Sequence, residues 1–136
     1  MRWLIVLTIA ISSIARAETR QLTAPIATVS FPTELAALDD PARSRLLDVA
    51  AWARANPWRL VVVQGFSDPT GDPTIDIARS QDLADAVVAQ LIEDGVPPRR
   101  IVSAAYGSDE PGAARVVVVR GTQAEYRALI ERQRVV

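Results

Sequence analysis

The sequence predicts a single α+β domain with the element order β-α-β-α-β-β-α. Apolar, β-branched runs typical of strands recur along the chain. Between them, two longer stretches carry apolar residues at the three- and four-residue spacing of an amphipathic helix. Clusters of glycine, proline and aspartate separate these segments. The 136 residues, of which 49% are hydrophobic, are enough for one buried core, so this order predicts one layered domain.

The first three elements lie before residue 64. Residues 26–31 suit a strand, which Pro32 ends because proline cannot donate to a ladder. Asp39-Asp40-Pro41 predicts a helix start, with a carboxylate as N-cap and proline in the first turn. Apolar residues then recur at helical spacing until Asn56-Pro57 ends the helix. The continuous apolar run from Leu60 to Val63 predicts a buried central strand.

The remaining elements follow a polar turn at residues 65–71. A second helix is expected from about Ile75 to Asp94 and ends at Gly95. Strands are expected at residues 101–105 and 115–120. The capping box Thr122-x-x-Glu125 predicts a last helix at residues 122–134. The second helix is expected to bury one apolar face, made of Ile77, Ala84, Val87, Val88 and Leu91.

The N-terminus has the pattern of a signal peptide over residues 1–17. Arg2 precedes an apolar run from Trp3 to Ile11, and Ala15-Arg16-Ala17 offers small residues for cleavage. An uncleaved anchor is the alternative. The expected organisation is a signal peptide at 1–17, a lead-in at 18–25 and a domain at 26–136. No later segment is apolar enough to span a membrane, and the absence of cysteine excludes a lipid on an N-terminal cysteine.

Composition excludes several classes of function. Beyond residue 17 there are 13 basic and 16 acidic residues, a balance that argues against a nucleic-acid partner. The chain has no histidine and no cysteine, so we expect it not to be an enzyme. No cofactor is expected. The aspartates at 68, 72 and 76 lack the spacing of a calcium loop, so no metal is expected either.

Two stretches resemble a known family. Residues 61–71 are Val-Val-Val-Gln-Gly-Phe-Ser-Asp-Pro-Thr-Gly, similar to a strand followed by Gly-His-Thr-Asp-x-x-Gly. Residues 101–111, with Tyr106-Gly107 and Glu110-Pro111, resemble the next strand and a Gly-Tyr-Gly-Glu-x-x-Pro turn. The chain thus resembles the OmpA-like peptidoglycan-binding domain over about residues 26–120. The resemblance implies helices on a mixed β-α-β-α-β-β sheet, to which this chain adds its C-terminal helix.

The resemblance implies non-covalent binding of peptidoglycan through the diaminopimelate of its stem peptide. That ligand presents an ammonium and a carboxylate, and the family supplies an Asp and, within Asn-x-x-Leu-Ser-x-x-Arg, an Arg. Carried over position by position, the candidate ligand-binding residues are Asp68, Gly71, Asp76, Arg79, Ser80 and Arg115.

Three departures weaken this match. Leu83 stands where the family has its binding arginine, and Phe66 replaces the usual histidine. The connection from Gly107 to Arg115 is too short for the helix that the family places there. Arg79 and Arg115 are therefore the candidate replacements for the lost guanidinium.

Each candidate also has a structural interpretation. Arg79 can simply pair with Asp76 or Asp82 in solvent, because residues three apart are neighbours on a helix. Asp68 can serve only as a turn former. Trp52 and Trp58 are expected to pack rather than to stack on sugars, and Arg99-Arg100 to be a solvated pair.

Two functions therefore remain open. The first is a peptidoglycan-binding module in the periplasm, at the outer membrane or the cell wall. The second is a degenerate OmpA-like domain that serves as a protein-interaction or scaffold module in an envelope assembly.

Overall fold

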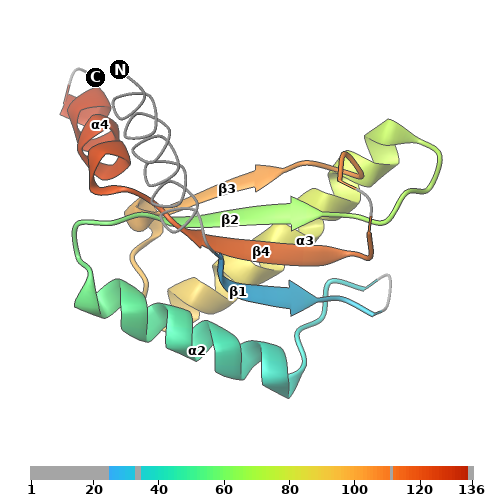
Figure 1. The fold of residues 1–136 in the computed structure, drawn as a ribbon, viewed down its shortest axis with the longest axis horizontal. Helices are drawn as coiled ribbons and strands as arrows, with labels where there is room; N and C mark the ends of the chain where they lie inside the picture. Colours follow the sequence, from blue (N-terminus) through green and yellow to red (C-terminus); the bar gives the residue numbers. More distant parts are fainter. Residues whose placement is uncertain (1–24, 33–34, 111, 135–136) are drawn as a thin grey trace, which may run out of the picture.

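The computed structural model describes residues 25–32, 35–110 and 112–134 (Figure 1). The signal-peptide segment 1–17 and nearly all of the lead-in lie outside these residues. The elements are β1 (Pro25–Ser30), α2 (Asp40–Ala55), β2 (Val61–Phe66), α3 (Pro73–Glu93), a short 3₁₀ turn (Pro98–Arg100), β3 (Ile101–Ala105), β4 (Arg115–Arg120) and α4 (Gln123–Arg134). The predicted α+β order is confirmed.

The four strands form one mixed sheet in the order β1-β4-β2-β3. β2 runs parallel to β3, with Val61 opposite Ile101, and α3 makes the crossover between them. β4 lies between β1 and β2 and is antiparallel to both. β1 and β3 are therefore the edges of the sheet.

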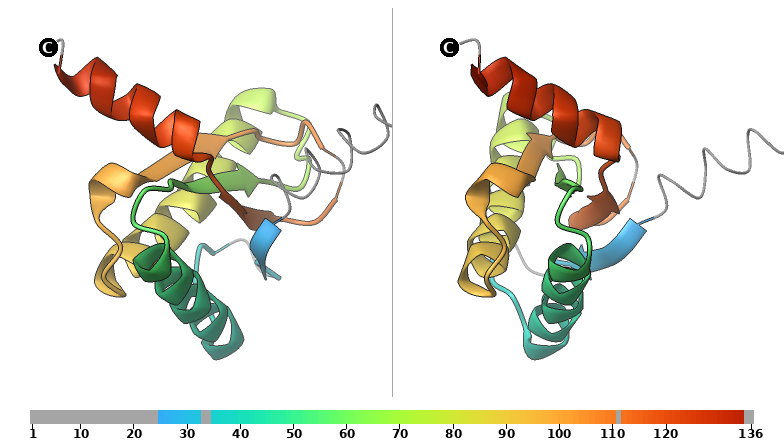
Figure 2. Two further views of the ribbon diagram at one scale, coloured as in Figure 1. Left: turned by 60° about the vertical axis from the view of Figure 1, so that its left-hand side comes forward. Right: turned by 90° about the vertical axis from the view of Figure 1, so that its left-hand side faces the viewer.

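The two long helices cover one face of the sheet (Figures 1 and 2). One hydrophobic core joins them to the strands. Its fully buried members include Leu46 and Val49 of α2, Val87 and Leu91 of α3, and Val61 of β2. In both helices these residues recur at the three- and four-residue spacing that the sequence predicted for the buried face.

Gly65 sets how closely α3 approaches the sheet. A Cβ atom at this position would overlap the backbone carbonyl oxygen of Ser80 and lie 3.2 Å from Cβ of Ala84. Only glycine lets the strand and the helix backbone meet at this distance. The contact fixes α3, and with it the loop between β2 and α3.

Helix starts follow the expected chemistry. Asp39 caps α2 by accepting from the backbone N–H of Ala42 at 2.9 Å. At the start of α4, the N–H of Glu125 donates to Thr122 Oγ1, and the N–H of Thr122 donates to the Glu125 carboxylate. These contacts confirm the predicted N-cap and capping box.

Three expectations need correction. β2 continues to Phe66, because its ladders with β3 and β4 extend through the glycine-containing segment that had suggested a turn. Ile77 is 53% exposed, because the buried face of α3 includes Asp76 and Ser80 and so lies to one side of it. Arg100 is only 7% exposed and donates to the carbonyl oxygens of Ala53, Asn56 and Arg59, so it is no solvated residue.

Among the described residues, no helix combines the length and the apolar character that crossing a bilayer requires.

Candidate functional site

The candidate site lies where β2 ends and α3 begins, at the right-hand end of the sheet in Figure 1. Asp68 follows β2 by two residues, and Arg79 lies in the second turn of α3. An Nη atom of Arg79 lies 3.2 Å from a carboxylate oxygen of Asp68. The Asp68 side chain is 48% exposed and that of Arg79 24% exposed, so the pair is accessible from solvent. Arg79 therefore pairs with Asp68 rather than with Asp76 or Asp82.

Asp76 has a different role from that of Asp68, because it is buried and holds the loop. Its carboxylate accepts from the N–H of Thr70 at 3.0 Å, from Thr70 Oγ1 at 2.6 Å and from Ser108 Oγ at 2.7 Å. The hydrogen bond from the Thr70 hydroxyl, followed by that from Ser108, holds the pKa of Asp76 below its usual value. Asp76 thus ties the β2–α3 loop to the turn after β3 and stays ionised.

Ser80 is fully buried and serves the same connection. Its hydroxyl donates to the carbonyl of Ile77 at 2.8 Å and accepts from the N–H of Gly107 at 2.9 Å. Gly107 has φ = +60°, and a Cβ there would lie 3.1 Å from Ile77 Cγ1. Ser80 therefore positions the turn after β3 against α3 and has no free hydroxyl to offer a ligand.

Gly71 shapes the loop without touching a neighbour. Its φ of +93° is a conformation that residues with a side chain rarely adopt, and the space around its Cβ position is open. Asp72 follows as the N-cap of α3 and accepts from the N–H of Thr74 at 2.9 Å. The turn therefore directs the chain from Asp68 into the helix that carries Arg79.

Arg115 is occupied elsewhere at the same end of the sheet. It lies opposite Phe66 in the β2–β4 register, and its guanidinium lies 4.6 Å above the centre of the Phe66 ring. It also pairs with Glu110 at 3.2 Å. Phe66 in turn stacks on Tyr106, with 5.3 Å between the ring centres. The structure thus gives Arg115 a packing role and brings Arg79, not Arg115, to Asp68.

Leu83 is buried in the hydrophobic core. In the Asn-x-x-Leu-Ser-x-x-Arg pattern, Arg79 stands at the leucine position and Leu83 at the arginine position. The apolar and basic residues have exchanged places one turn apart on the same side of α3. A comparison of single positions shows only that the arginine at position 83 is lost. The helical period shows that Arg79, one turn earlier, lies on the same side of α3.

Thr70 and Ser108 are site residues that the sequence did not indicate. Thr70 lies in an Asp-Pro-Thr-Gly turn, where a hydroxyl that contacts a nearby carboxylate is a common arrangement. Ser108 contacts Asp76 across 32 residues of chain, and no local pattern signals this contact. In the described part of the chain, the acidic side chains form no group that could hold a metal ion.

The fold and the site define a small α+β domain with a pair of opposite charges at its surface. A match over residues 30–121 identifies the chain as a member of the OmpA family. The family match ends before α4, so the last helix is an addition to the matched region. OmpA-family domains are not enzymes.

Two curated relatives are peptidoglycan-associated lipoproteins. Those of Pasteurella multocida and Haemophilus influenzae are 38% and 37% identical to this chain over 68 residues, or 49% of its length. The alignments span 45% and 44% of the two lipoproteins, so this chain matches less than half of each.

Solved structures share the fold. The peptidoglycan-associated lipoprotein of Burkholderia pseudomallei superimposes with a TM-score of 0.64 at 23% identity, over 68% of this chain and 88% of that one. The C-terminal domain of Helicobacter pylori MotB gives a TM-score of 0.64 at 18% identity, over 79% and 97% of the two chains. At these identities the similarity is one of fold.

Proposed function

We propose that this chain is an exported envelope protein that binds peptidoglycan without a covalent bond, with Asp68 and Arg79 as its two ligand-binding charges. One observation carries the proposal, namely the 3.2 Å contact between these side chains. A diaminopimelate centre presents an ammonium and a carboxylate on one carbon atom. A receptor for it needs an acid and a base side by side, and this pair meets that need at an accessible surface.

In this proposal, ligand binding breaks the Asp68–Arg79 ion pair and forms one ion pair between the ligand and each of the two side chains. The ligand ammonium binds Asp68, and its carboxylate takes two parallel hydrogen bonds from the planar guanidinium of Arg79. The partial exposure of both side chains keeps the resting pair weak, so a zwitterion can separate it at little cost. Asp76 and Ser80 position the loop and the turn around the site, and Gly71 directs the chain between the two charged residues.

The test is sedimentation with purified sacculi, using protein recovered from the periplasm of an expression host. Asp68→Asn and Arg79→Gln should each weaken binding at least about tenfold, because each removes a charge-assisted partner of the ligand. Asp40→Asn with Arg43→Gln is the matched control, because that exposed pair has the same charges and a similar 3.0 Å separation. Free diaminopimelate should release the protein, and 1,5-diaminopentane, which has no carboxylate, should not.

The proposal fails if both site variants sediment as the wild type does, or if the control pair weakens binding equally. The same preparation checks export. Cleavage after Ala17 predicts a mature chain that begins at Glu18, which the mass of the periplasmic protein will show.

A second function, a protein-interaction module, is favoured by exposed apolar side chains near the site. Ile75 and Ile77 of α3 and Tyr106 after β3 are all exposed, and Ile77 lies against Gly107. Protein partners use such groups as anchors. Protein that stays in the supernatant with sacculi, while Ile77→Ser abolishes a complex recovered from the envelope, would establish this second function instead.

A further inference from the structure

The two ends of the sheet differ in charge. We call the end at Phe66 the site end and the end at Val61 the arginine end. The ion pairs in the described part of the chain are Asp40–Arg43, Asp68–Arg79 and Glu110–Arg115, and all three lie at the site end. The arginine end carries Arg54, Arg59, Arg99, Arg120 and Arg127, for which the described residues supply no carboxylate partner within 4.0 Å. The acidic Glu93, Asp94, Glu125 and Glu131 lie on the helix ends there, so the arginines exceed the carboxylates, whereas at the site end the carboxylates exceed the arginines.

Aromatic side chains accompany these arginines. The guanidinium groups of Arg59 and Arg120 lie 5.4 and 5.9 Å from the centre of the Trp52 ring. Trp58 is 62% exposed and meets Tyr126 of α4 edge to face, with 6.2 Å between the ring centres. Trp, Tyr and Arg are the residue types most enriched among the residues that dominate binding at interfaces.

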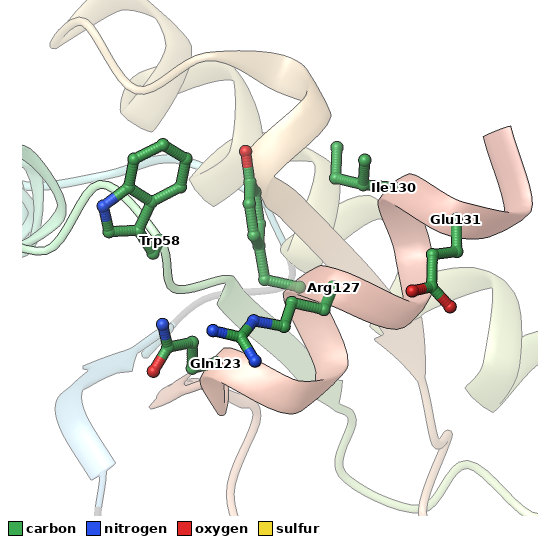
Figure 3. A pocket seen from close by; sticks show the side chains of 6 residues that line it. Trp58, Gln123, Arg127, Ile130 and Glu131 are labelled. Carbon is green, nitrogen blue, oxygen red and sulfur yellow. The ribbon is translucent and has the colours of Figure 1, made fainter. Parts of the chain in front are cut away.

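Trp58 and α4 border an open hollow of about 490 Å³ (Figure 3). Its other lining residues include Gln123, Arg127 and Ile130, so it is neither a closed apolar cavity nor an acidic site. Glu131 is the carboxylate that lines it, on the far side of Arg127 in the next turn of α4.

The chain enters the domain at this same end. β1 begins at Pro25, which lies opposite Val119, next to Arg120. Residues 18–24, which remain after cleavage behind Ala17, therefore join the domain at the arginine end.

We propose that the arginine end docks on the surface of a bilayer that contains anionic phospholipids. Guanidinium groups bind headgroup phosphates through paired hydrogen bonds, and a basic surface is attracted to the negative potential of such a bilayer. Trp58 and Tyr126 would lie at headgroup depth, where an aromatic ring with one polar atom is most stable. The six residues of β2 then place the site end about 20 Å farther from the lipid. In this orientation Asp68 and Arg79 face away from the bilayer, toward the cell wall, and this part of the inference rests on the proposed function. The docking itself does not depend on it.

Vesicle flotation tests the proposal with the periplasmic protein. The wild type should float with vesicles of phosphatidylcholine and phosphatidylglycerol, not with phosphatidylcholine alone, and added salt should release it. Arg120→Gln and Arg127→Gln should each weaken binding about fivefold, the share of one arginine near an anionic surface. Trp58→Ala should weaken it as well. Arg43→Gln is the matched control, because it removes an exposed arginine from the site end.

Equal flotation with both kinds of vesicle would overturn the proposal, and so would equal binding by the wild type and the Arg120→Gln, Arg127→Gln double variant. Inorganic phosphate that releases the protein at constant ionic strength would show a phosphate-ion site only. A stoichiometric complex with one envelope protein, lost in Trp58→Ala, without vesicle binding would show a protein interface instead. The double variant should bind sacculi as the wild type does, so failure of this inference is distinguishable from failure of the proposed function.

Discussion

Arg100 has a structural role that mutation can test directly. It is almost fully buried, and its guanidinium donates to Ala53 O at 2.8 Å, to Asn56 O at 2.6 Å and to Arg59 O at 3.0 Å. These carbonyls belong to the end of α2 and the loop that leads into β2. The carbonyls of Ala53 and Asn56 each accept one backbone N–H, from Asn56 at 3.3 Å and from Arg59 at 3.1 Å. Arg100 supplies a second donor to each, so it caps the end of α2 and its following loop from 41 to 47 residues away.

Arg100→Ala should therefore destabilise the fold strongly. A hydrogen bond from a charged group contributes about 1.5–3 kcal/mol, and the contributions of one side chain are not additive. The Ala53 carbonyl is buried and loses a donor, whereas the other two can turn partly toward water. We expect a loss of about 3–5 kcal/mol in the free energy of unfolding, or a fall in Tm of roughly 12–25 °C.

Urea and thermal unfolding followed by circular dichroism measure this loss. Arg100→Lys should fall between the wild type and the alanine variant, because an ammonium keeps the charge but not the planar fork. Arg99→Ala is the matched control, since Arg99 is exposed, and it should change stability by less than about 0.5 kcal/mol. If Arg100→Ala costs no more than Arg99→Ala, the cap assigned to Arg100 is wrong.

Three further predictions concern the site and its support. Gly65→Ala should prevent α3 from seating on β2 and cost more than about 3 kcal/mol in urea unfolding. Gly71→Ala should cost less, about 1–3 kcal/mol, because its Cβ meets no neighbour and only the strain of φ = +93° remains. Leu83→Arg, although it restores the family pattern, should lower stability by several kcal/mol and gain no affinity for sacculi, because position 83 is in the core. Asp76 should stabilise the fold fully above its unfolded pKa of about 3.8, and this contribution should vanish as pH falls through the lower folded pKa. Asp76→Asn should therefore reduce the pH dependence of the free energy of unfolding across this acidic range. An unchanged pH dependence would refute the linkage.

Most of the fold could be predicted from the sequence because its signals are local. Asp39 before Asp40-Pro41 predicted the start of α2, and the apolar run at Val116 to Val119 predicted β4. Asp72-Pro73 carries the same signal and starts α3 two residues before the predicted Ile75. The sheet order was not predictable, because the β4 register depends on contacts between distant segments.

The site was harder to predict because its contacts join residues from separate loops and helices. Asp68 and Arg79 were both candidates, yet their pairing depends on how Gly65 seats α3, which no residue spacing expresses. Ile77 was assigned to the buried face because it is apolar and shares the helical spacing of that face. The structure buries Asp76 instead, because three hydrogen-bond donors compensate its carboxylate, and one of those donors comes from a distant turn.

Both charges of the proposed site lie within one uninterrupted segment of twelve residues, from Asp68 to Arg79. That segment is anchored to the sheet by the glycine at its base, and the connection between β3 and β4 contributes neither charge. The short β3–β4 connection of this chain therefore leaves both charges of the proposed site in place, and it bears on the site only through the hydroxyl of Ser108 that reaches Asp76.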